Sequence, residues 1–478
     1  MNRSSRSCPG PQATVFTGRR AFMKFGLAGA GLTLPGLLRL RAAASETEVG
    51  QSVPSRSGKA VILVWQPGGC SHIDTYDPKP LASSEYRGPF AQIATKIPGY
   101  SFTELIPRQA AIADKMVVLR SMYQLAPGHP AGTMQLLSGD PDTRDKPAPK
   151  YPDWMSIAHY LLSQRAAGVP RTLPGYIGIN PPTEYNGPAY LGDAYSPFSI
   201  SGDPSDPNFV VPNIGLTDVG EIGRIQRKVQ LRERLDTMDR AFDSANELGA
   251  LDQFESQALA LLTDPSTKRA FDLSLEDNAT RDRYGRNSWG QQLLMARRLA
   301  EAGVDIITTS LNGKLCGRVR NWDDHAVNHN VFEALRFRAA AYDQAVTALI
   351  EDIYQRGLDE RILVCVTGEF GRTPKISYQP STGAGDGSAP AGTKQPGRDH
   401  WVRGFSNIWS GGGIRVGQVV GATDKLGEDA VERRCGPGDF LATIYHHLGI
   451  DSSNVFIEDL SGRPTPIVDH GKPIPELI

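Results

Sequence analysis

The chain has 478 residues but only five cysteines and no C-x-x-C pair, which excludes a compact disulfide framework and a cysteine-based zinc finger. One bridge between Cys316 and Cys435 stays an open alternative. The formal net charge of -1 gives no positive field for nucleic acid or an anionic membrane surface. The G-x-S-x-G elbow, the G-x-x-x-x-G-K-[ST] phosphate loop and the H-E-x-x-H motif are also absent. The composition, 40% apolar and 22% charged, is that of an ordinary globular protein. Any functional site must therefore use residues other than those of the absent motifs.

Long apolar stretches are also missing, since a membrane span takes about 20 residues. The N-terminus has a different pattern, in which Arg19 and Arg20 precede a weakly apolar segment at 25–38 and small residues follow it. This order predicts a twin-arginine export signal at 1–44, cleaved near Ala44. The prediction implies contact with the twin-arginine export machinery, a periplasmic or extracellular mature protein and no stable membrane span after cleavage. An uncleaved membrane anchor is the alternative.

Beyond residue 58, short β-branched runs alternate with longer helical stretches. Buried strands are predicted at 59–65, 116–120, 304–310, 361–367 and 405–410. Helices are predicted near 131–137, 218–248, 251–263, 287–302, 332–356 and 439–448. Such alternation is typical of an α/β fold with a mostly parallel central sheet and helices on both faces.

The domain organisation follows from composition. Residues 45–58 are polar and predict a disordered lead-in. A single domain is expected over 59–475, with an irregular, proline- and glycine-rich insertion near 141–215 and a helical segment near 218–302. The insertion is rich in aromatics, for which carbohydrate binding is one interpretation and local packing another. These aromatics are Tyr176, Tyr185, Tyr190, Tyr195 and Phe198.

Polar residues recur where the predicted strands end and in the loops between elements. The clusters are His72 with Asp74, His129, Asp323 with His325, Glu369 with Arg372, and Asp399 with His400. Four of these five clusters contain histidine, although the chain has only nine histidines. Because the ends of parallel strands share one edge of a sheet, we expect the clusters to converge there. Mixed Asp, Glu and His ligands suit a divalent ion such as Zn²⁺, Mn²⁺ or Ca²⁺.

Each cluster also has a purely structural interpretation. The first fits a turn with a capping carboxylate, and the second fits a hydrogen-bonded loop histidine. The third fits a helix N-cap, and the last two fit local ion pairs. The shared position at strand ends is what favours a single site.

Several blocks of the chain, in order, resemble the bacterial family called domain of unknown function 1501. The blocks are 66–79, 128–130, 137–139, 321–325, 368–375, 397–401, 411–415 and 417–424. They cover nearly the whole mature chain, and a twin-arginine signal is usual for that family. The family in turn is similar to the alkaline phosphatase and sulfatase superfamily, which has a mostly parallel sheet and two metal positions at strand ends.

This resemblance implies an alkaline phosphatase-like domain and metal-binding roles for particular residues. Asp323 and His325 match a metal-binding Asp and His, and His400 matches a late metal-binding His. Glu369 stands where the superfamily has an Asp-His pair, with Phe370 in place of the second ligand. No C-x-P-x-R is present, so a formylglycine sulfatase is excluded.

We therefore expect an exported metal-dependent hydrolase of small phosphate or sulfate esters that acts through a metal-bound water. His129 is expected to act as acid, base or ligand, and Arg372 to contact an anionic group. The first-strand Asp of the superfamily is missing, so His72 or Asp74 would substitute for it. The expected metal ligands are His72, Asp74, Asp323, His325, Glu369, Asp399 and His400. The alternative is a non-catalytic exported binding or structural protein with the same fold.

Overall fold

The computed structural model describes residues 58–165, 172–182, 185–211, 264–313, 315, 321–383 and 388–478. The predicted export signal, the lead-in up to residue 57, and the helices expected at 218–248 and 251–263 lie outside these residues. Cys316 also lies outside them, so its pairing with the buried Cys435 stays an open alternative. Within the described part of the chain, no helix is long and apolar enough to cross a membrane.

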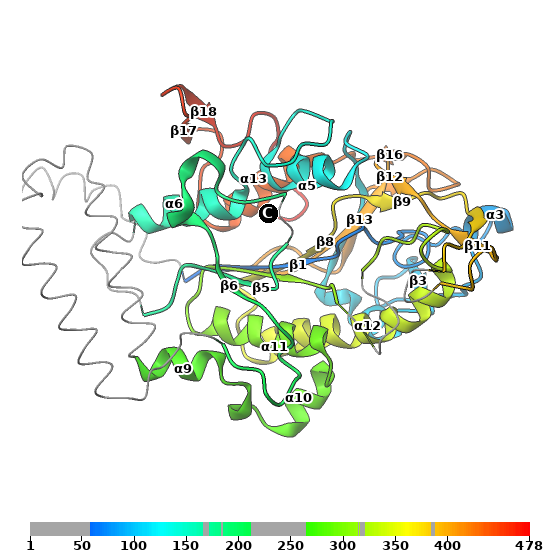
Figure 1. The fold of residues 1–478 in the computed structure, drawn as a ribbon, viewed down its shortest axis with the longest axis horizontal. Helices are drawn as coiled ribbons and strands as arrows, with labels where there is room; N and C mark the ends of the chain where they lie inside the picture. Colours follow the sequence, from blue (N-terminus) through cyan, green and yellow to red (C-terminus); the bar gives the residue numbers. More distant parts are fainter. Residues whose placement is uncertain are drawn as a thin grey trace, which may run out of the picture. The chain divides into compact units, whose positions relative to one another are not determined.

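A sheet forms the centre of the fold and lies between two layers of helices (Figure 1). It has eight strands in the order β14-β4-β13-β8-β1-β7-β5-β6. Its strands are β1 (Ala60–Trp65), β4 (Val117–Met122), β5 (Tyr176–Ile179), β6 (Phe198–Ile200), β7 (Ile306–Ser310), β8 (Ile362–Thr367), β13 (Phe405–Gly411) and β14 (Gln418–Val420). β1 pairs in parallel with β7 and β8, whereas β13 runs antiparallel to both of its neighbours, β4 and β8. The prediction of an α/β fold with a mostly parallel sheet is confirmed, with β13 as the antiparallel strand of this sheet.

Helices cover both faces of the sheet, which explains why every residue of β1 and β8 is buried. Val61, Leu63 and Trp65 of β1 point to one face, where they share a core with three helices. These are α5 (His129–Ser138), α6 (Trp154–Arg165) and α13 (Pro437–His447). Ile62 and Val64 point to the opposite face. The helices there are α4 (Pro107–Ala111), α11 (Ser288–Glu301) and α12 (Val331–Gln355).

Short elements connect these layers. The minor helices are α3 (Ser84–Arg87), α9 (Pro265–Phe271), α10 (Asn278–Tyr284), and the 3₁₀ turns η1 (Ala113–Lys115), η2 (Ala189–Leu191), η3 (Asp193–Tyr195) and η5 (Leu273–Leu275). The two-stranded pairs are β2 (Gln92–Ala94) with β3 (Ser101–Thr103), β9 (Gly371–Arg372) with β12 (His400–Trp401), β10 (Ser377–Pro380) with β11 (Lys394–Gly397), β15 (Ala422–Thr423) with β16 (Ala430–Glu432), and β17 (Phe456–Glu458) with β18 (Pro464–Pro466). Of these, the β9–β12 pair matters most for function, because it sets His400 opposite Arg372.

The segment 141–215 contains more regular structure than its composition indicates. It includes the twelve-residue helix α6 and the strands β5 and β6, which extend the main sheet beyond β7. Its aromatics pack against protein. Tyr176 is fully buried, Tyr195 contacts Tyr160 edge to face, and Phe198 contacts Phe271. These contacts agree with local packing and give no support to a carbohydrate-binding surface.

Candidate metal centre

Three parallel strands bring distant parts of the chain to one edge of the sheet. β4, β7 and β8 run in the same direction, so the segments that follow them leave from the same edge. His129 opens α5 after β4, Asp323 and His325 follow β7, and Glu369 follows β8. His400 reaches the same place because β12 pairs with β9 directly after Glu369 and Phe370. The predicted convergence of these clusters therefore follows from strand direction.

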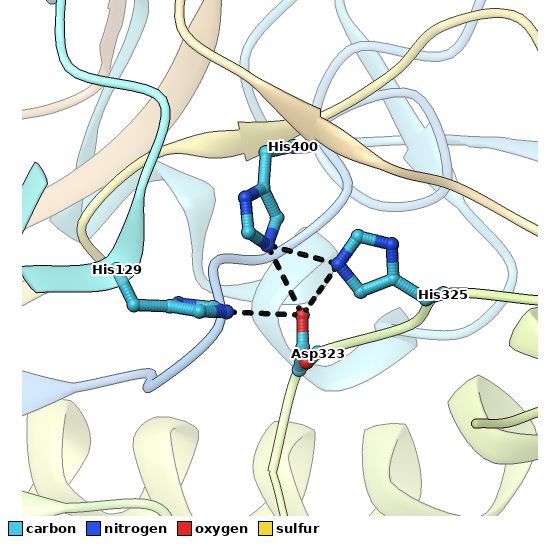
Figure 2. Close-up of side chains that lie close together, drawn as sticks. All are labelled: His129, Asp323, His325 and His400. Carbon is cyan, nitrogen blue, oxygen red and sulfur yellow. Dashed lines mark hydrogen bonds and ion pairs between the residues drawn. The ribbon is translucent and has the colours of Figure 1, made fainter. Parts of the chain in front are cut away.

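Four side chains meet at this edge: His129, Asp323, His325 and His400 (Figure 2). Their ligand atoms all lie within 4.8 Å of one another. Asp323 Oδ1 lies 3.3 Å from His129 Nε2, 3.1 Å from His325 Nε2 and 3.4 Å from His400 Nε2. The Nε2 atoms of His325 and His400 are 2.9 Å apart. We call these four residues the metal cluster.

The second nitrogen of each imidazole is held by an acceptor. His129 Nδ1 lies 2.6 Å from Glu369 Oε1, and His325 Nδ1 lies 2.7 Å from Asp399 Oδ1. His400 Nδ1 lies 2.7 Å from the carbonyl oxygen of Pro127. Because carboxylates and carbonyls only accept hydrogen bonds, Nδ1 must donate in each case. With neutral rings, three Nε2 lone pairs face one carboxylate oxygen, so the cluster needs positive charge at its centre, supplied by a metal ion or by protons on the Nε2 atoms.

The spacing of these atoms fits a metal ion. Tetrahedral ligands bound at about 2.0–2.1 Å lie about 3.3 Å from one another. The three separations between Asp323 Oδ1 and the imidazole nitrogens, 3.1 to 3.4 Å, match that value, and the remaining separations run from 2.9 Å between His325 and His400 to at most 4.8 Å. Three nitrogens and one oxygen are also the donor types that zinc accepts. The residues present therefore fit one divalent ion.

The electrostatics of the cluster agree with this geometry. Burial lowers the pKa of His129, but hydrogen bonds with Asp323 and Glu369 outweigh it and raise the pKa to about 9. Hydrogen bonds with Asp323 and Asp399 raise the pKa of His325 to about 9 as well. Burial raises the pKa of Asp323, yet hydrogen bonds from the three imidazoles hold that pKa well below its usual range. The cluster thus attracts positive charge, whether as protons or as a metal ion.

Phe370 forms an apolar wall beside the cluster. Its buried ring lies 4.3 Å from the His400 ring and 5.2 Å from the His129 ring, measured between centroids. The position where the superfamily resemblance implies a second ligand is therefore filled by an aromatic ring in contact with two of the four residues.

Arg372 was expected to contact an anionic group, and in the structure its guanidinium faces protein groups. The side chain is fully buried, and its donors point into the protein. It donates to the carbonyl oxygens of Gly68, Gly69 and Arg398, and to Asp323 Oδ1 at 2.7 Å. Arg372 therefore ties Asp323 to two neighbouring loops, and contact with a ligand anion stays a prediction.

His72 and Asp74 also differ from expectation, because the structure does not bring them into the metal cluster. Asp74 is buried in an ion pair with Arg398, 2.6 Å from its Nε, and accepts a hydrogen bond from Ser71 Oγ at 2.7 Å. His72 Nε2 lies 2.9 Å from the Gly427 carbonyl oxygen, and burial lowers its pKa to about 4. The turn interpretation fits this segment, and we leave both residues out of the proposed ligand set.

Glu369 and Asp399 lie at the site, but one step away from its centre. Each accepts a hydrogen bond from the Nδ1 of a cluster histidine, so the imidazole ring separates the carboxylate from the centre of the metal cluster. Glu369 pairs with His129 and its Oε1 also accepts from the Gly68 N–H at 2.8 Å, whereas Arg372 pairs with Asp323. The alternative that Asp323 caps the following helix does not hold either, since the N-cap of α12 is Asn330.

Two contributions to the site were not predicted. The Pro127 carbonyl has no signal in the sequence, because any residue carries a backbone oxygen. Asp145 lies in the segment expected to be irregular, yet its Oδ1 accepts from the Ala131 N–H at 3.1 Å and so caps the helix that begins with His129. A carboxylate in a loop a short distance after Gly-His-Pro is the one signal that could have indicated it.

Comparisons with solved structures give distant matches. The PsFucS1 sulfatase from Pseudoalteromonas sp. is 13% identical over 86% of this chain and 71% of that chain, with a TM-score of 0.33. The phosphonate monoester hydrolase of Agrobacterium radiobacter is 14% identical over 88% and 77%, with a TM-score of 0.29. The C-terminal periplasmic domain of EcEptC from Escherichia coli, a complex with Zn, is 10% identical over 87% of each chain, with a TM-score of 0.32. At these scores the matches carry no argument, and the chemistry rests on the residues described above.

No curated protein matches the chain. A family model does: the family described as "Protein of unknown function (DUF1501)" matches residues 58–478. That range begins just before β1 and ends at the last residue, so it includes the whole central sheet and all four residues of the metal cluster. The chain therefore belongs to the DUF1501 family.

Proposed function

We propose that this protein is an exported metal-dependent hydrolase of phosphate or sulfate esters, related to the alkaline phosphatase and sulfatase superfamily. The observation that carries the proposal is the convergence of three imidazole Nε2 atoms on Asp323 Oδ1, with every Nδ1 held by an acceptor. Structural histidines need no such arrangement, whereas metal-binding histidines almost always have it.

The donor set narrows the choice of ion. Ca²⁺ and Mg²⁺ prefer oxygen ligands, whereas the metal cluster offers three nitrogens and one oxygen. Zn²⁺ is therefore the best match, and Mn²⁺ is the second candidate. The earlier expectation of Ca²⁺ is the least compatible with these ligands.

A bound divalent ion would polarise a phosphoryl or sulfuryl oxygen and lower the pKa of a water molecule. The chain's own residues prepare that chemistry. Glu369, Asp399 and the Pro127 carbonyl orient the three rings, while Arg372 orients Asp323. The four cluster residues include no hydroxyl or thiol, and the attacking group that we propose is a water molecule on the metal. His129, with a third of its side chain exposed, is the most exposed of the four, and with Nε2 on the metal and Nδ1 on Glu369 it would act as a ligand and not as the acid or base.

The test combines metal analysis with an activity screen. Purified protein is expected to hold one Zn²⁺ or Mn²⁺ per chain and to hydrolyse aryl phosphates or aryl sulfates. Asp323→Asn and His325→Ala should lose most of the metal and at least about 100-fold of the activity, since both remove cluster ligands. His446→Ala, an exposed histidine on α13, is the matched control and should keep both.

Two results would count against this function. Absence of stoichiometric metal, together with unchanged thermal stability in His325→Ala, would overturn the metal centre itself. Stoichiometric metal without hydrolysis of any ester would favour the alternative, a non-catalytic exported binding protein that uses the same fold.

Export is proposed on the N-terminal sequence alone. Arg19 and Arg20 before a weakly apolar segment are typical of substrates of the twin-arginine export machinery. That route carries folded proteins, which would allow the metal to be bound before export. Cell fractionation tests the proposal: Arg19→Lys combined with Arg20→Lys should retain the protein in the cytoplasm, and unchanged export would contradict the route.

A further inference from the structure

The charge balance of the metal cluster sets a limit on its substrates. Three carboxylates belong to the site: Asp323 at the centre, and Glu369 and Asp399 behind two of the rings. Arg372 is the one Lys or Arg of the described residues within 4.0 Å of any of them. With neutral imidazoles and one divalent ion, three negative charges meet three positive charges, and the site is neutral as a whole.

Other cations on the neighbouring segments do not change this balance, because each is paired with a carboxylate outside the cluster. The pairs are Arg338 with Asp324, Arg398 with Asp74, Lys375 with Glu85, and Arg403 with Asp429. Arg338 and Arg398 are also fully buried, so they cannot turn toward a ligand without breaking these pairs.

The helix that begins at the site has few free N–H groups for an anion in its first turn. The first turn of α5 would attract an anion through its free N–H groups. Pro130 has no N–H, the Ala131 N–H donates to Asp145, and the Gly132 N–H donates to the Gly128 carbonyl. Asp145 is exposed and adds a negative charge beside Gly128, next to His129. This end of the helix therefore repels a second negative charge.

A doubly charged ligand is penalised in such a site. The cost of removing an ion from water grows with the square of its charge, so a dianion loses about four times the hydration free energy of a monoanion. In a positively charged site, attraction to Arg or Lys side chains offsets that desolvation cost. This site is neutral when its metal is bound, and Asp145 adds a negative charge at its edge. The second charge of a dianion is therefore not stabilised here.

We propose that this site takes esters with one negative charge at the reacting group, namely phosphodiesters and sulfate monoesters, in preference to doubly charged phosphate monoesters. The inference rests on the proposed metal-dependent hydrolase and specifies its substrate class. It concerns binding as well as turnover, which allows a test that does not depend on the reactivity of a leaving group.

Calorimetry on the zinc-loaded full chain compares two ligands of nearly the same shape. Phenylphosphonate is a dianion at alkaline pH, and its monomethyl ester is a monoanion. The monomethyl ester should bind at least as tightly as phenylphosphonate. Binding of phenylphosphonate more than about tenfold tighter would overturn the inference while leaving the metal centre and the hydrolase function intact. Failure of both ligands to bind would overturn it together with the proposed function, whereas a metal-free protein would contradict the proposed function directly.

A pair of variants tests the role of the rim charge. Asp145→Asn keeps an oxygen acceptor for the Ala131 N–H and removes one negative charge, so it should shift the affinity ratio toward phenylphosphonate by about three- to fivefold. Asp142→Asn is the matched control on the same loop, because Asp142 is already paired with Arg144. An equal shift in both variants, or none in Asp145→Asn, would show that the rim charge does not select between the two ligands.

Discussion

At the scale of single residues, each histidine of the metal cluster has two distinct roles. Nε2 faces the centre, and Nδ1 donates to an acceptor that fixes the ring. The acceptors differ in kind, because two are carboxylates and one is the Pro127 carbonyl. A carboxylate makes the imidazole a stronger base than a carbonyl does, so His129 and His325 should contribute more to metal affinity than His400.

Asp399 allows this role to be tested apart from the ligands. Asp399→Ala removes the acceptor of His325 Nδ1 but leaves all four cluster residues in place. Metal affinity should fall by about 10- to 100-fold in a competitive chelator titration. Thermal stability of the metal-free protein should change little, since the Asp399 side chain is 39% exposed.

Asp429→Ala is the control for Asp399→Ala, because Asp429 pairs with the exposed Arg403 instead of a cluster histidine. Its metal affinity should equal that of the unmodified chain. Equal losses in the two variants would mean that Asp399 acts through general surface charge and not through His325.

The sequence is a good guide to which residues lie at the site. It is a poorer guide to the direction in which each side chain points. Asp323, His325 and His400 meet as expected, and His129 joins them. Asp324 shows the limit, since it directly follows Asp323 yet is buried with Arg338 on the other side of the loop. Arg372 shows it again, because its burial depends on three loops from distant parts of the chain.

At the scale of elements, the turn after β1 supports the loop that carries Asp323. Pro67 O accepts a hydrogen bond from the Trp322 N–H at 2.8 Å, and Arg372 binds the carbonyl oxygens of Gly68 and Gly69. Gly68 adopts φ +100°, and a Cβ at this position would lie 2.4 Å from the Asp323 nitrogen. The turn therefore needs glycine both for its backbone conformation and for the close approach of Asp323.

Gly68→Ala should therefore damage the metal site as well as the fold. The free energy of unfolding should fall by more than the roughly 1–2 kcal/mol that a positive φ alone costs, because the Asp323 backbone must move. Metal affinity should fall in the same variant. Gly99→Ala separates the two effects, since Gly99 also has a positive φ, +83°, but nothing lies within 4 Å of its Cβ position. If both variants lost equal stability and no metal affinity, the close approach would not be a constraint.

Elements differ in how far the sequence predicts them. The apolar runs of β1, β4 and β8 are recognisable because burial on both faces leaves few polar residues in them. β7 and β13 are buried as well, but they mix Ile, Phe and Trp with Thr, Ser and Asn. Strand direction is not encoded in such a run, so the antiparallel β13 could not be predicted from it. β5 and β6 have only four and three residues, and prolines and glycines around them hide their pairing with the main sheet.

At the scale of the whole molecule, the helix layers and the sheet are connected by hydrogen bonds, and His447 makes two of these bonds. This buried histidine of α13 lies with Nε2 3.1 Å from the Ala60 carbonyl oxygen and Nδ1 3.2 Å from the Gly412 carbonyl oxygen. It thereby connects the helix layer to the start of β1 and to the residue after β13. Burial lowers the pKa of His447 to about 4.

This pKa predicts how stability depends on pH. The folded-state pKa of His447, about 4, lies below the unfolded value of about 6.5, so the unfolded chain binds the proton first as pH falls. The contribution of neutral His447 is complete above about pH 6.5 and is lost between there and about pH 4. The difference between the two pKa values corresponds to about 3 kcal/mol in the free energy of unfolding. His447→Gln lacks this titration, so in urea unfolding its loss of stability relative to the unmodified chain should shrink by about 3 kcal/mol from neutral pH to pH 4.

His72 and the cluster histidines titrate in both proteins, so their contributions cancel when the two free energies of unfolding are compared. His446→Gln, an exposed change on the same helix, controls for the loss of a histidine. A deficit that stays constant with pH would mean that His447 is protonated in the folded protein and donates to both carbonyl oxygens.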